Sequence, residues 1–229
     1  METVHRNMFR ERILIADDHA IFAEALRVYL LEKTFAVIGA VADGRALLRE
    51  AARLRPDVII VDFAMPLLNG LDAARRIREQ VPDARFVFLT MHDDANLAAA
   101  TLELGRVGFV LKQSGGLELL KAIEEILHGR SYLTPKLRAE DWVATKTRAR
   151  QFSKELTNRQ RDLVQLFAEG RPMKEIAAVL NLSEKTVEFH KHHIMVAFNL
   201  KSNADLVLFG LKHGLIAVDP EPHQRVLAA

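Results

Sequence analysis

Cysteine is absent from this chain of 229 residues. Its absence excludes disulfide bridges, a cysteine nucleophile and thiolate metal sites. Long apolar runs are missing as well: no stretch approaches the ~20 residues that cross a bilayer, and the segment from Met1 to Arg12 lacks the apolar core of a signal peptide. We therefore expect a cytoplasmic protein that does not act at a membrane.

A dominant charge of one sign is also lacking, because 32 basic residues face 30 acidic ones and the net charge is +2. The distribution is uneven: residues 1–130 contain 17 Lys and Arg against 19 Asp and Glu, and residues 131–229 contain 15 against 11. With 49% hydrophobic residues, the chain can build the cores of one large or two modest domains. An acidic first part and a basic second part suit a regulatory domain joined to a nucleic-acid binder.

Short, continuous apolar runs in the first half alternate with helical patterns. Such runs are typical of buried parallel strands, and successive strand–helix units place helices on both faces of the sheet. We expect an α/β fold with a flavodoxin-like, doubly wound sheet of five parallel strands. The pairs Asp43-Gly44 and Asn69-Gly70 are read as turns. The expected strands are Arg12–Ala16, Ala36–Val41, Val58–Asp62, Arg85–Thr90 and Phe109–Leu111, and the expected helices are Ala20–Glu32, Arg45–Arg55, Leu71–Gln80, Ala95–Leu104 and Leu117–His128.

From Leu156 onward the strand runs disappear and the pattern becomes helical. Thr157 and Gln160 have the spacing of a capping box at the start of a helix, and Gly170 ends that helix. Two helices joined by a short turn within a small bundle form a helix-turn-helix, so we expect a small all-α domain of this kind. The helices expected after Gly170 are Met173–Leu180, Glu184–Phe198 and Asn203–His213.

These patterns divide the chain into four parts. We expect the α/β domain over residues 9–130, a linker over 131–152, the helix-turn-helix domain over 153–217 and a loose tail over 218–229. The linker opens with Tyr132-Leu133-Thr134-Pro135 and could hold a helix around Ala139–Ala149.

Polar side chains follow four of the expected strands at the point where each strand ends. The carboxyl ends of parallel strands share one edge, where ligands bind, so these side chains should converge. Carboxylates are ligands that Mg²⁺ prefers, and Asp62 could attack a phosphoryl group while the metal, Lys112 and Thr90 stabilise its oxygens. Any one of them alone would be read as an ordinary polar residue at the edge of a sheet, but the whole set favours phosphoryl chemistry. The set is Asp17, Asp18, Asp62, Thr90 and Lys112.

Residues 11–129 resemble the receiver domain of two-component response regulators. The motifs that carry this resemblance are Asp17-Asp18-His19, Asp62-Phe63-Ala64-Met65-Pro66-Leu67-Leu68-Asn69-Gly70, Leu89-Thr90-Met91-His92 and Gly108-Phe109-Val110-Leu111-Lys112. The resemblance implies that a sensor histidine kinase phosphorylates Asp62 in a Mg²⁺-dependent reaction, with Thr90 as the switch hydroxyl. Phe109 matches the family's switch aromatic, and the alternative of a plain core aromatic is equally open. By position, the residues implied to hold Mg²⁺ are Asp17, Asp18, Asp62 and the main-chain carbonyl of Ala64.

The expected helix Glu184–Phe198 offers a polar face that could enter the major groove of DNA, opposite a side that faces the bundle core. Three of its side chains could meet phosphates, and three could meet base edges. The alternative is an ordinary solvated helix face. The candidates for phosphates are Lys185, Thr186 and Lys191, and those for base edges are Glu188, Phe189 and His192.

This second half is similar to the LuxR-type helix-turn-helix. With the receiver-like part, residues 11–217 resemble the NarL/FixJ family of transcriptional regulators. That family implies a recognition helix that reads double-stranded DNA and a last helix that forms a homodimer in the active state, here through Asp205, Leu206 and Phe209. The motifs that carry the likeness are Leu156-Thr157-Asn158-Arg159-Gln160, Ala168-Glu169-Gly170, Lys174-Glu175-Ile176-Ala177 and Leu182-Ser183-Glu184-Lys185-Thr186-Val187-Glu188-Phe189-His190.

The recognition helix departs from that family in its charges. Val196 and Ala197 stand where basic residues are common, Glu188 adds a negative charge, and three histidines supply a positive charge that depends on pH. We expect weaker non-specific phosphate binding than is usual, and an affinity that rises as the pH falls from about 8 to about 6. The histidines are His190, His192 and His193.

Our leading hypothesis is a transcription factor, not an enzyme, whose dimerisation and DNA binding are controlled by phosphorylation of Asp62. One alternative is a DNA-binding regulator that works without phosphate. A weaker alternative is a phosphohydrolase with Asp62 as nucleophile, because such enzymes of the dehalogenase-like type want a second acid two residues later, where this chain has Ala64.

Overall fold

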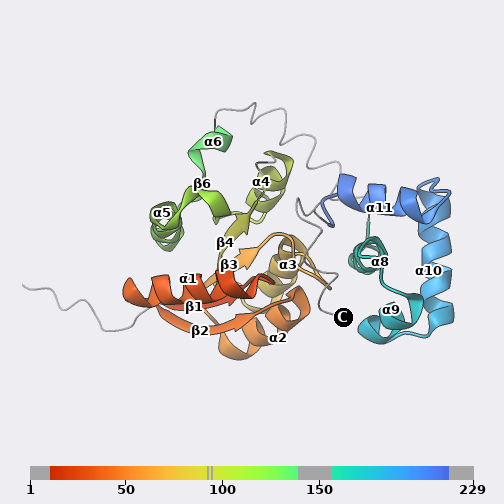
Figure 1. Cartoon of the computed structure of the whole chain (residues 1–229), viewed down its shortest axis with the longest axis horizontal. Coiled ribbons are helices and arrows are strands. Elements are labelled where there is room, and N and C mark those ends of the chain that lie inside the picture. Colours follow the sequence, from red (N-terminus) through yellow and green to blue (C-terminus); the bar gives the residue numbers. More distant parts are fainter. Residues whose placement is uncertain (1–10, 92, 94, 139–155, 217–229) are drawn as a thin grey trace, which may run out of the picture. The chain divides into compact units, whose positions relative to one another are not determined.

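The computed structural model describes residues 11–91, 93, 95–138 and 156–216. The chain divides into two compact units, Met1–Arg150 and Gln151–Ala229, and each is described here by itself. Figure 1 shows a sheet with surrounding helices in the first unit and helices alone in the second. The helix expected around Ala139–Ala149 and the tail expected over 218–229 lie outside the described residues.

The first unit contains a six-stranded parallel sheet in the order β2-β1-β3-β4-β5-β6. The order of its first five strands is flavodoxin-like, which confirms the expected α/β fold class. The strands are β1 Arg12–Ala16, β2 Ala36–Val41, β3 Val58–Asp62, β4 Arg85–Thr90, β5 Val107–Leu111 and β6 Tyr132–Leu133. The helices are α1 Ala20–Glu32, α2 Gly44–Leu54, α3 Gly70–Gln80, α4 Ala95–Leu102, α5 Gly116–Leu127 and the short α6 Pro135–Arg138.

The sixth strand corrects the expectation that residue 131 begins a linker and that the sheet has five strands. Tyr132 and Leu133 are buried, and they pair with Gly108 and Phe109 of β5. Thr134 extends the attachment, because its amide donates to the carbonyl of Phe109 at 3.0 Å. A two-residue strand is too short to show a period, so the sequence pattern could not reveal it.

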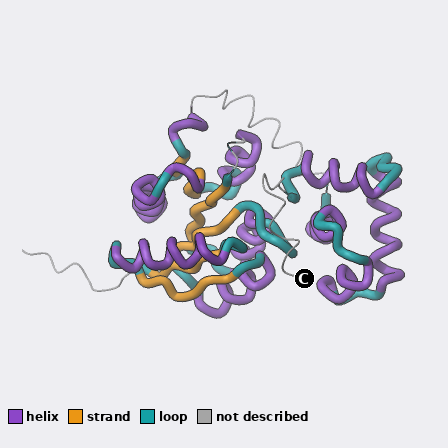
Figure 2. The backbone as a smooth tube through the Cα atoms, in the orientation of Figure 1, coloured by secondary structure: helices purple, strands orange, loops and turns teal. Residues whose placement is uncertain are grey.

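Both faces of the sheet are buried under helices, as Figure 2 shows with strands in orange between helices in purple. Leu14 and Ala16 of β1 join the apolar cluster under α2, α3 and α4, whereas Ile13 and Ile15 join the cluster under α1 and α5. The alternation places successive side chains of one strand on opposite faces. This double burial explains why the strands are continuous apolar runs in the sequence.

Two expected turns begin helices instead. Asp43 accepts a hydrogen bond from the amide of Ala46 and is the N-cap of α2, and Asn69 accepts from the amide of Asp72 and is the N-cap of α3. Asp and Asn followed by Gly suit both a turn and a helix start, since the short side chain can satisfy a free backbone N–H in either setting. The helix starts therefore fall one residue earlier than expected.

The second unit is all-α, with α8 Asn158–Ala168, α9 Met173–Leu180, α10 Glu184–Ala197 and α11 Asn203–Lys212. The capping box of Thr157 and Gln160 is formed at the start of α8, as predicted. Asn181 takes a left-handed conformation after α9, and Ser183 caps α10, so a short turn joins the two helices. This confirms the helix-turn-helix.

Among all residues described in both units, no helix combines the length and apolar character needed to cross a membrane.

Candidate functional site

The strand register brings the predicted polar residues to one edge of the sheet. Asp62 is the last residue of β3 and Thr90 the last of β4, while Asp17 and Lys112 directly follow β1 and β5. Lys112 joins the two acids: its Nζ lies 2.7 Å from Asp17 Oδ2 and 2.8 Å from Asp62 Oδ2. Residues about a hundred positions apart thus meet in one ionic group.

This ionic group is buried, and its burial shifts the pKa values of its members. Asp62 is 3% exposed, and its desolvation raises the pKa of its carboxyl to about 6, although Lys112 pulls it down. Burial alone would lower the pKa of Lys112, but the charges of Asp62 and Asp17 outweigh it and leave that pKa above its usual value. The ammonium is therefore charged at neutral pH, and Asp62 is mostly ionised there.

The acceptor candidate Asp62 is held from the loop that follows it. The amide of Ala64 donates to Asp62 Oδ1 at 3.2 Å, and the amide of Gly70 donates to the carbonyl of Phe63 at 3.0 Å. A Cβ added at Gly70 would lie 2.2 Å from the carbonyl oxygen of Asp62, so only glycine lets α3 start this close to β3. The loop thereby fixes one carboxylate oxygen and leaves the other to Lys112.

Asp18 and His19 complete the cluster of possible metal donors. One ligand atom from each of Asp17, Asp18, His19 and Asp62 lies within 4.8 Å of all the others. Three of the four donors are carboxylates, which is the hard oxygen chemistry that Mg²⁺ prefers.

The two predicted switch residues lie on neighbouring strands. Thr90 is 1% exposed and pairs with Leu111, directly before Lys112. Phe109 is fully buried in the cluster that also contains Phe88 and Leu133, so in this structure its ring occupies a core position.

Two neighbours of this site were not singled out by the sequence reasoning. His19 was noted only as part of a motif, yet its Nδ1 lies 3.0 Å from Asp18 Oδ1 and 3.2 Å from Asp17 Oδ1. Phe22 of α1 lies under the Lys112 ammonium, which is 4.8 Å from the ring centroid. The sequence signal that could have indicated both residues is their spacing: His19 and Phe22 are three residues apart at the start of a helix, and residues i and i+3 share a helix face.

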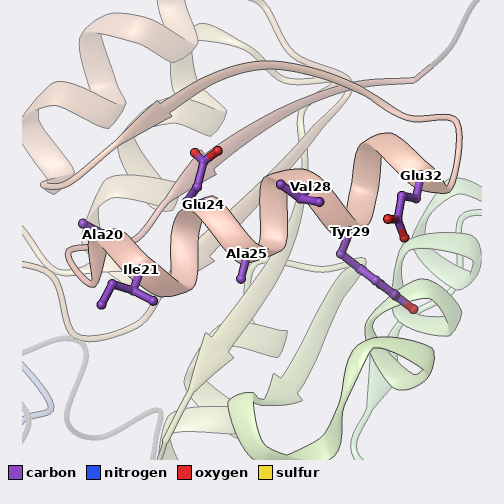
Figure 3. Close-up of a pocket in the computed structure, with 7 residues that line it drawn as sticks. All are labelled: Ala20, Ile21, Glu24, Ala25, Val28, Tyr29 and Glu32. Carbon is purple, nitrogen blue, oxygen red and sulfur yellow. The ribbon is translucent and has the colours of Figure 1, made fainter.

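A separate shallow pocket of about 640 Å³ lies along α1. Figure 3 shows that all its lining residues belong to this one helix, with Ala20 and Ile21 at one end and Glu32 at the other. Its surface is mostly apolar, and Ile21 is 89% exposed. None of the clustered carboxylates lines it, so the reactive groups lie at the sheet edge and not in this pocket.

In the second unit, the predicted DNA-contacting side chains differ in exposure. Phe189 is 59% exposed, and its ring packs at a tilt against His193 with centroids 4.3 Å apart. Lys191 is only half-exposed, because its ammonium lies 4.9 Å from the ring centroid of Phe167 on α8. Of the predicted DNA-contacting residues, those exposed on α10 are Lys185, Glu188, Phe189 and His192, whereas Thr186 is half-buried and hydrogen-bonds Ser183.

The residues predicted to form a dimer interface on α11 also occupy different positions. Leu206 is 1% exposed and packs inside the unit, and Asp205 completes a capping box with Ser202. Phe209 packs at a tilt against both Phe198 and His213, with centroid distances of 4.8 and 4.0 Å. Leu208, which was not named from the sequence, is 63% exposed.

Comparison with known proteins identifies the family. A model of the response regulator receiver domain matches residues 13–124, and a model of the bacterial regulatory proteins of the luxR family matches residues 154–209. The oxygen regulatory protein NreC of Staphylococcus epidermidis is 34% identical over 215 residues, which cover 90% of this chain and 99% of NreC. The chain belongs to the NarL/FixJ family of two-component response regulators. It is a DNA-binding response regulator, as the resemblance of its motifs implied.

Other members of the NarL/FixJ family are similar over nearly their whole length. The transcriptional regulatory protein DegU of Brevibacillus brevis is 28% identical over 235 residues, covering 95% of this chain and 99% of DegU. The RcsB response regulator of Salmonella typhimurium is 27% identical, with a TM-score of 0.59 and coverage of 87% of this chain and 96% of RcsB. A second similar structure, with a TM-score of 0.52, 27% identity and coverage of 88% and 98%, contains two RcsB dimers bound to two DNAs. Of these relatives, DegU is by name a transcriptional regulatory protein.

Proposed function

We propose that Asp62 accepts a phosphoryl group from a sensor histidine kinase with the help of Mg²⁺, and that this step controls DNA binding. The observation that carries the proposal is the buried group in which the Lys112 ammonium contacts both Asp17 and Asp62. One ammonium balances one carboxylate. With Asp18 the site holds two carboxylates in excess, and this is the charge that one divalent cation offsets.

The residues present fit Mg²⁺. Oxygen donors gather within 4.8 Å, and Mg²⁺ needs only one or two carboxylates beside water and phosphate oxygens. Asp17, Asp18, Asp62 and the main-chain carbonyl of Ala64 would hold it. When bound, it supplies positive charge beside the phosphoryl oxygens.

The chemical step needs an ionised Asp62, and a pKa of about 6 leaves most of it ionised at neutral pH. A carboxylate oxygen of Asp62 attacks the phosphorus of a phosphohistidine, the P–N bond breaks, and the imidazole nitrogen leaves with the bonding pair and takes a proton from water. The product is an acyl phosphate on Asp62. Lys112, 2.8 Å from Asp62 Oδ2, then pairs with a phosphoryl oxygen.

The response would begin at Thr90, whose hydroxyl can bond the new phosphoryl group if the end of β4 moves toward it. Thr90 lies two residues beyond Phe88, which pairs with Phe109 of β5. Phe109 in turn shares a cluster with Leu133 of β6, from which the chain leaves the sheet. A change at Asp62 would in this way reach the segment that leads to the second unit.

The output would be DNA binding by a dimer. The exposed face of α10, with Lys185, Glu188, Phe189 and His192, would enter the major groove, and Lys191 would support it through Phe167. The dimer would use α11, with exposed Leu208 at its centre and Phe209 beside it, while Asp205 and Leu206 hold the helix in place. RcsB, which binds DNA as dimers, supports this arrangement.

The test uses the full chain, Asp62→Asn and the exposed control Asp83→Asn, each treated with acetyl phosphate with and without Mg²⁺. A DNA duplex is first selected from a random library with the treated wild-type protein. We expect wild type and Asp83→Asn to gain dimer mass and about tenfold higher affinity for this duplex, and Asp62→Asn to gain neither. Equal affinity of all proteins under all conditions would show a regulator that works without phosphate.

A further inference from the structure

His19 is placed as a fourth donor of the acidic cluster, and the helix does not use its side chain. It is the N-cap residue of α1, but it makes no side-chain cap hydrogen bond. Its main-chain amide donates to Asp17 Oδ1 at 2.9 Å. The imidazole Nδ1 instead lies beside carboxylate oxygens of Asp17 and Asp18.

The distances of Nδ1 fit a shared metal ion. Two ligands at right angles around an octahedral ion with bonds of about 2.1 Å are about 3.0 Å apart. Nδ1 lies 3.0 Å from Asp18 Oδ1, 3.2 Å from Asp17 Oδ1 and 3.8 Å from Asp62 Oδ2. Since the His19 side chain is 54% exposed, an ion can reach it from solvent.

We propose that His19 is a nitrogen ligand of the metal in this site, and that it shifts the site's preference from Mg²⁺ toward first-row transition metal ions such as Mn²⁺. This proposal rests on the proposed function, because it assumes that the carboxylates bind a divalent cation. Imidazole nitrogen binds transition metal ions more strongly than it binds Mg²⁺, which favours oxygen donors alone. His19 would thus set which cation supports phosphorylation when both are present.

The same distances would also suit hydrogen bonds from Nδ1 to the carboxylates. A measurement of metal binding distinguishes a hydrogen-bonded Nδ1 from one that coordinates the metal. The remaining charged group at the site is the Lys112 ammonium. On Asp17 the ammonium contacts Oδ2, whereas His19 contacts Oδ1, so the two side chains use different oxygens of this carboxylate. An ion bound by His19 and Asp17 Oδ1 would therefore leave Asp17 Oδ2 to Lys112.

The experiment uses the untagged full chain at pH 8, with Mn²⁺ alone or Mg²⁺ alone as the probe. His19→Asn removes the ring nitrogen, His128→Asn is a matched control at an exposed position directly after α5, and Asp18→Asn removes a carboxylate. Pulsed EPR of bound Mn²⁺ detects a directly bonded ¹⁴N. Calorimetry gives the affinity for each ion, and circular dichroism verifies that each variant is folded.

We expect a ¹⁴N coupling in wild type and His128→Asn that is lost in His19→Asn, together with a roughly tenfold fall in the ratio of Mn²⁺ to Mg²⁺ affinity in His19→Asn. Mn²⁺ that binds wild type without ¹⁴N coupling, with an unchanged ratio in His19→Asn, would overturn this proposal and leave the proposed function standing. Absence of Mn²⁺ and Mg²⁺ binding, or binding that Asp18→Asn does not weaken, would overturn both.

Discussion

Two regions of this protein carry charge in opposite ways. At the sheet edge, Lys112 and its acidic partners are almost fully buried and fixed by strand ends. On α10, Lys185 and Glu188 are exposed to solvent, where a side chain can change conformation to contact a bound partner. Buried charge is costly and must be matched by geometry, whereas exposed charge is screened and contributes little to stability. This contrast agrees with the proposed roles, a phosphorylation switch in the first region and DNA contacts in the second.

The same substitution at two lysines tests this contrast most strongly. Lys112→Met leaves Asp17 and Asp62 as buried carboxylates without their cation, so we expect a loss of about 3–5 kcal/mol of unfolding free energy. Lys191→Met removes only a contact with Phe167 at 4.9 Å, and we expect a loss of no more than about 1 kcal/mol. Urea unfolding of both variants gives these values, and equal losses would remove the contrast.

The sheet edge was predictable from the sequence because strand direction alone brings Asp17, Asp62 and Lys112 together. The burial of these side chains and the contact of Phe22 with Lys112 could not be predicted from the sequence, because both depend on how α1 packs. The short strand β6 has no period to detect. On α11, helical spacing could not show that Leu206 faces inward and Leu208 outward, because both are apolar and only the packing against α8 distinguishes them.

Replacing leucine by alanine distinguishes a buried leucine, Leu133, from an exposed one, Leu208. Leu133→Ala should cost about 2–3 kcal/mol, because this side chain packs with Phe109 and Phe88, and it should speed hydrogen exchange in β5. Leu208→Ala, at a position 63% exposed, should change stability by less than about 0.5 kcal/mol but weaken dimerisation. Thermal unfolding, exchange mass spectrometry and analytical ultracentrifugation measure the three effects. Unchanged exchange in β5 would contradict the role given to β6.

The burial of Asp62 also makes the stability of the folded protein depend on pH. Its pKa of about 6 in the folded protein lies above the usual value of 3.8, so between these values the folded state binds more protons than the unfolded state. Without metal, this group's contribution to the unfolding free energy is most favourable below about pH 4, is lost as the pH rises through 6, and becomes a cost of about 3 kcal/mol above it.

Asp62→Asn should therefore raise the unfolding free energy at pH 7.5 in EDTA by about 1–2 kcal/mol and leave it nearly unchanged at pH 4. Unfolding curves for both proteins from pH 4 to 8 test this. A variant that is less stable than wild type at neutral pH would show that Asp62 is not under electrostatic strain.

The smallest expected effect concerns the histidines of α10. Histidine is in general the side chain that supplies pH-dependent positive charge, and positive charge strengthens phosphate binding, so affinity for duplex DNA should rise a few-fold as the pH falls from about 8 to about 6. Replacing His190, His192 and His193 by Asn should remove most of the rise. Fluorescence anisotropy at constant ionic strength measures it, and a pH response that survives the replacement would assign it to other groups.

The central claim is that the buried carboxylate at the end of β3 is the phosphoryl acceptor. Mass spectrometry of the full chain after treatment with acetyl phosphate and Mg²⁺ tests it most directly. The account predicts one added phosphoryl group, located on Asp62, that is absent without Mg²⁺ and absent in Asp62→Asn. A phosphoryl group on any other residue, or none in wild type while Mg²⁺ is bound, would contradict it.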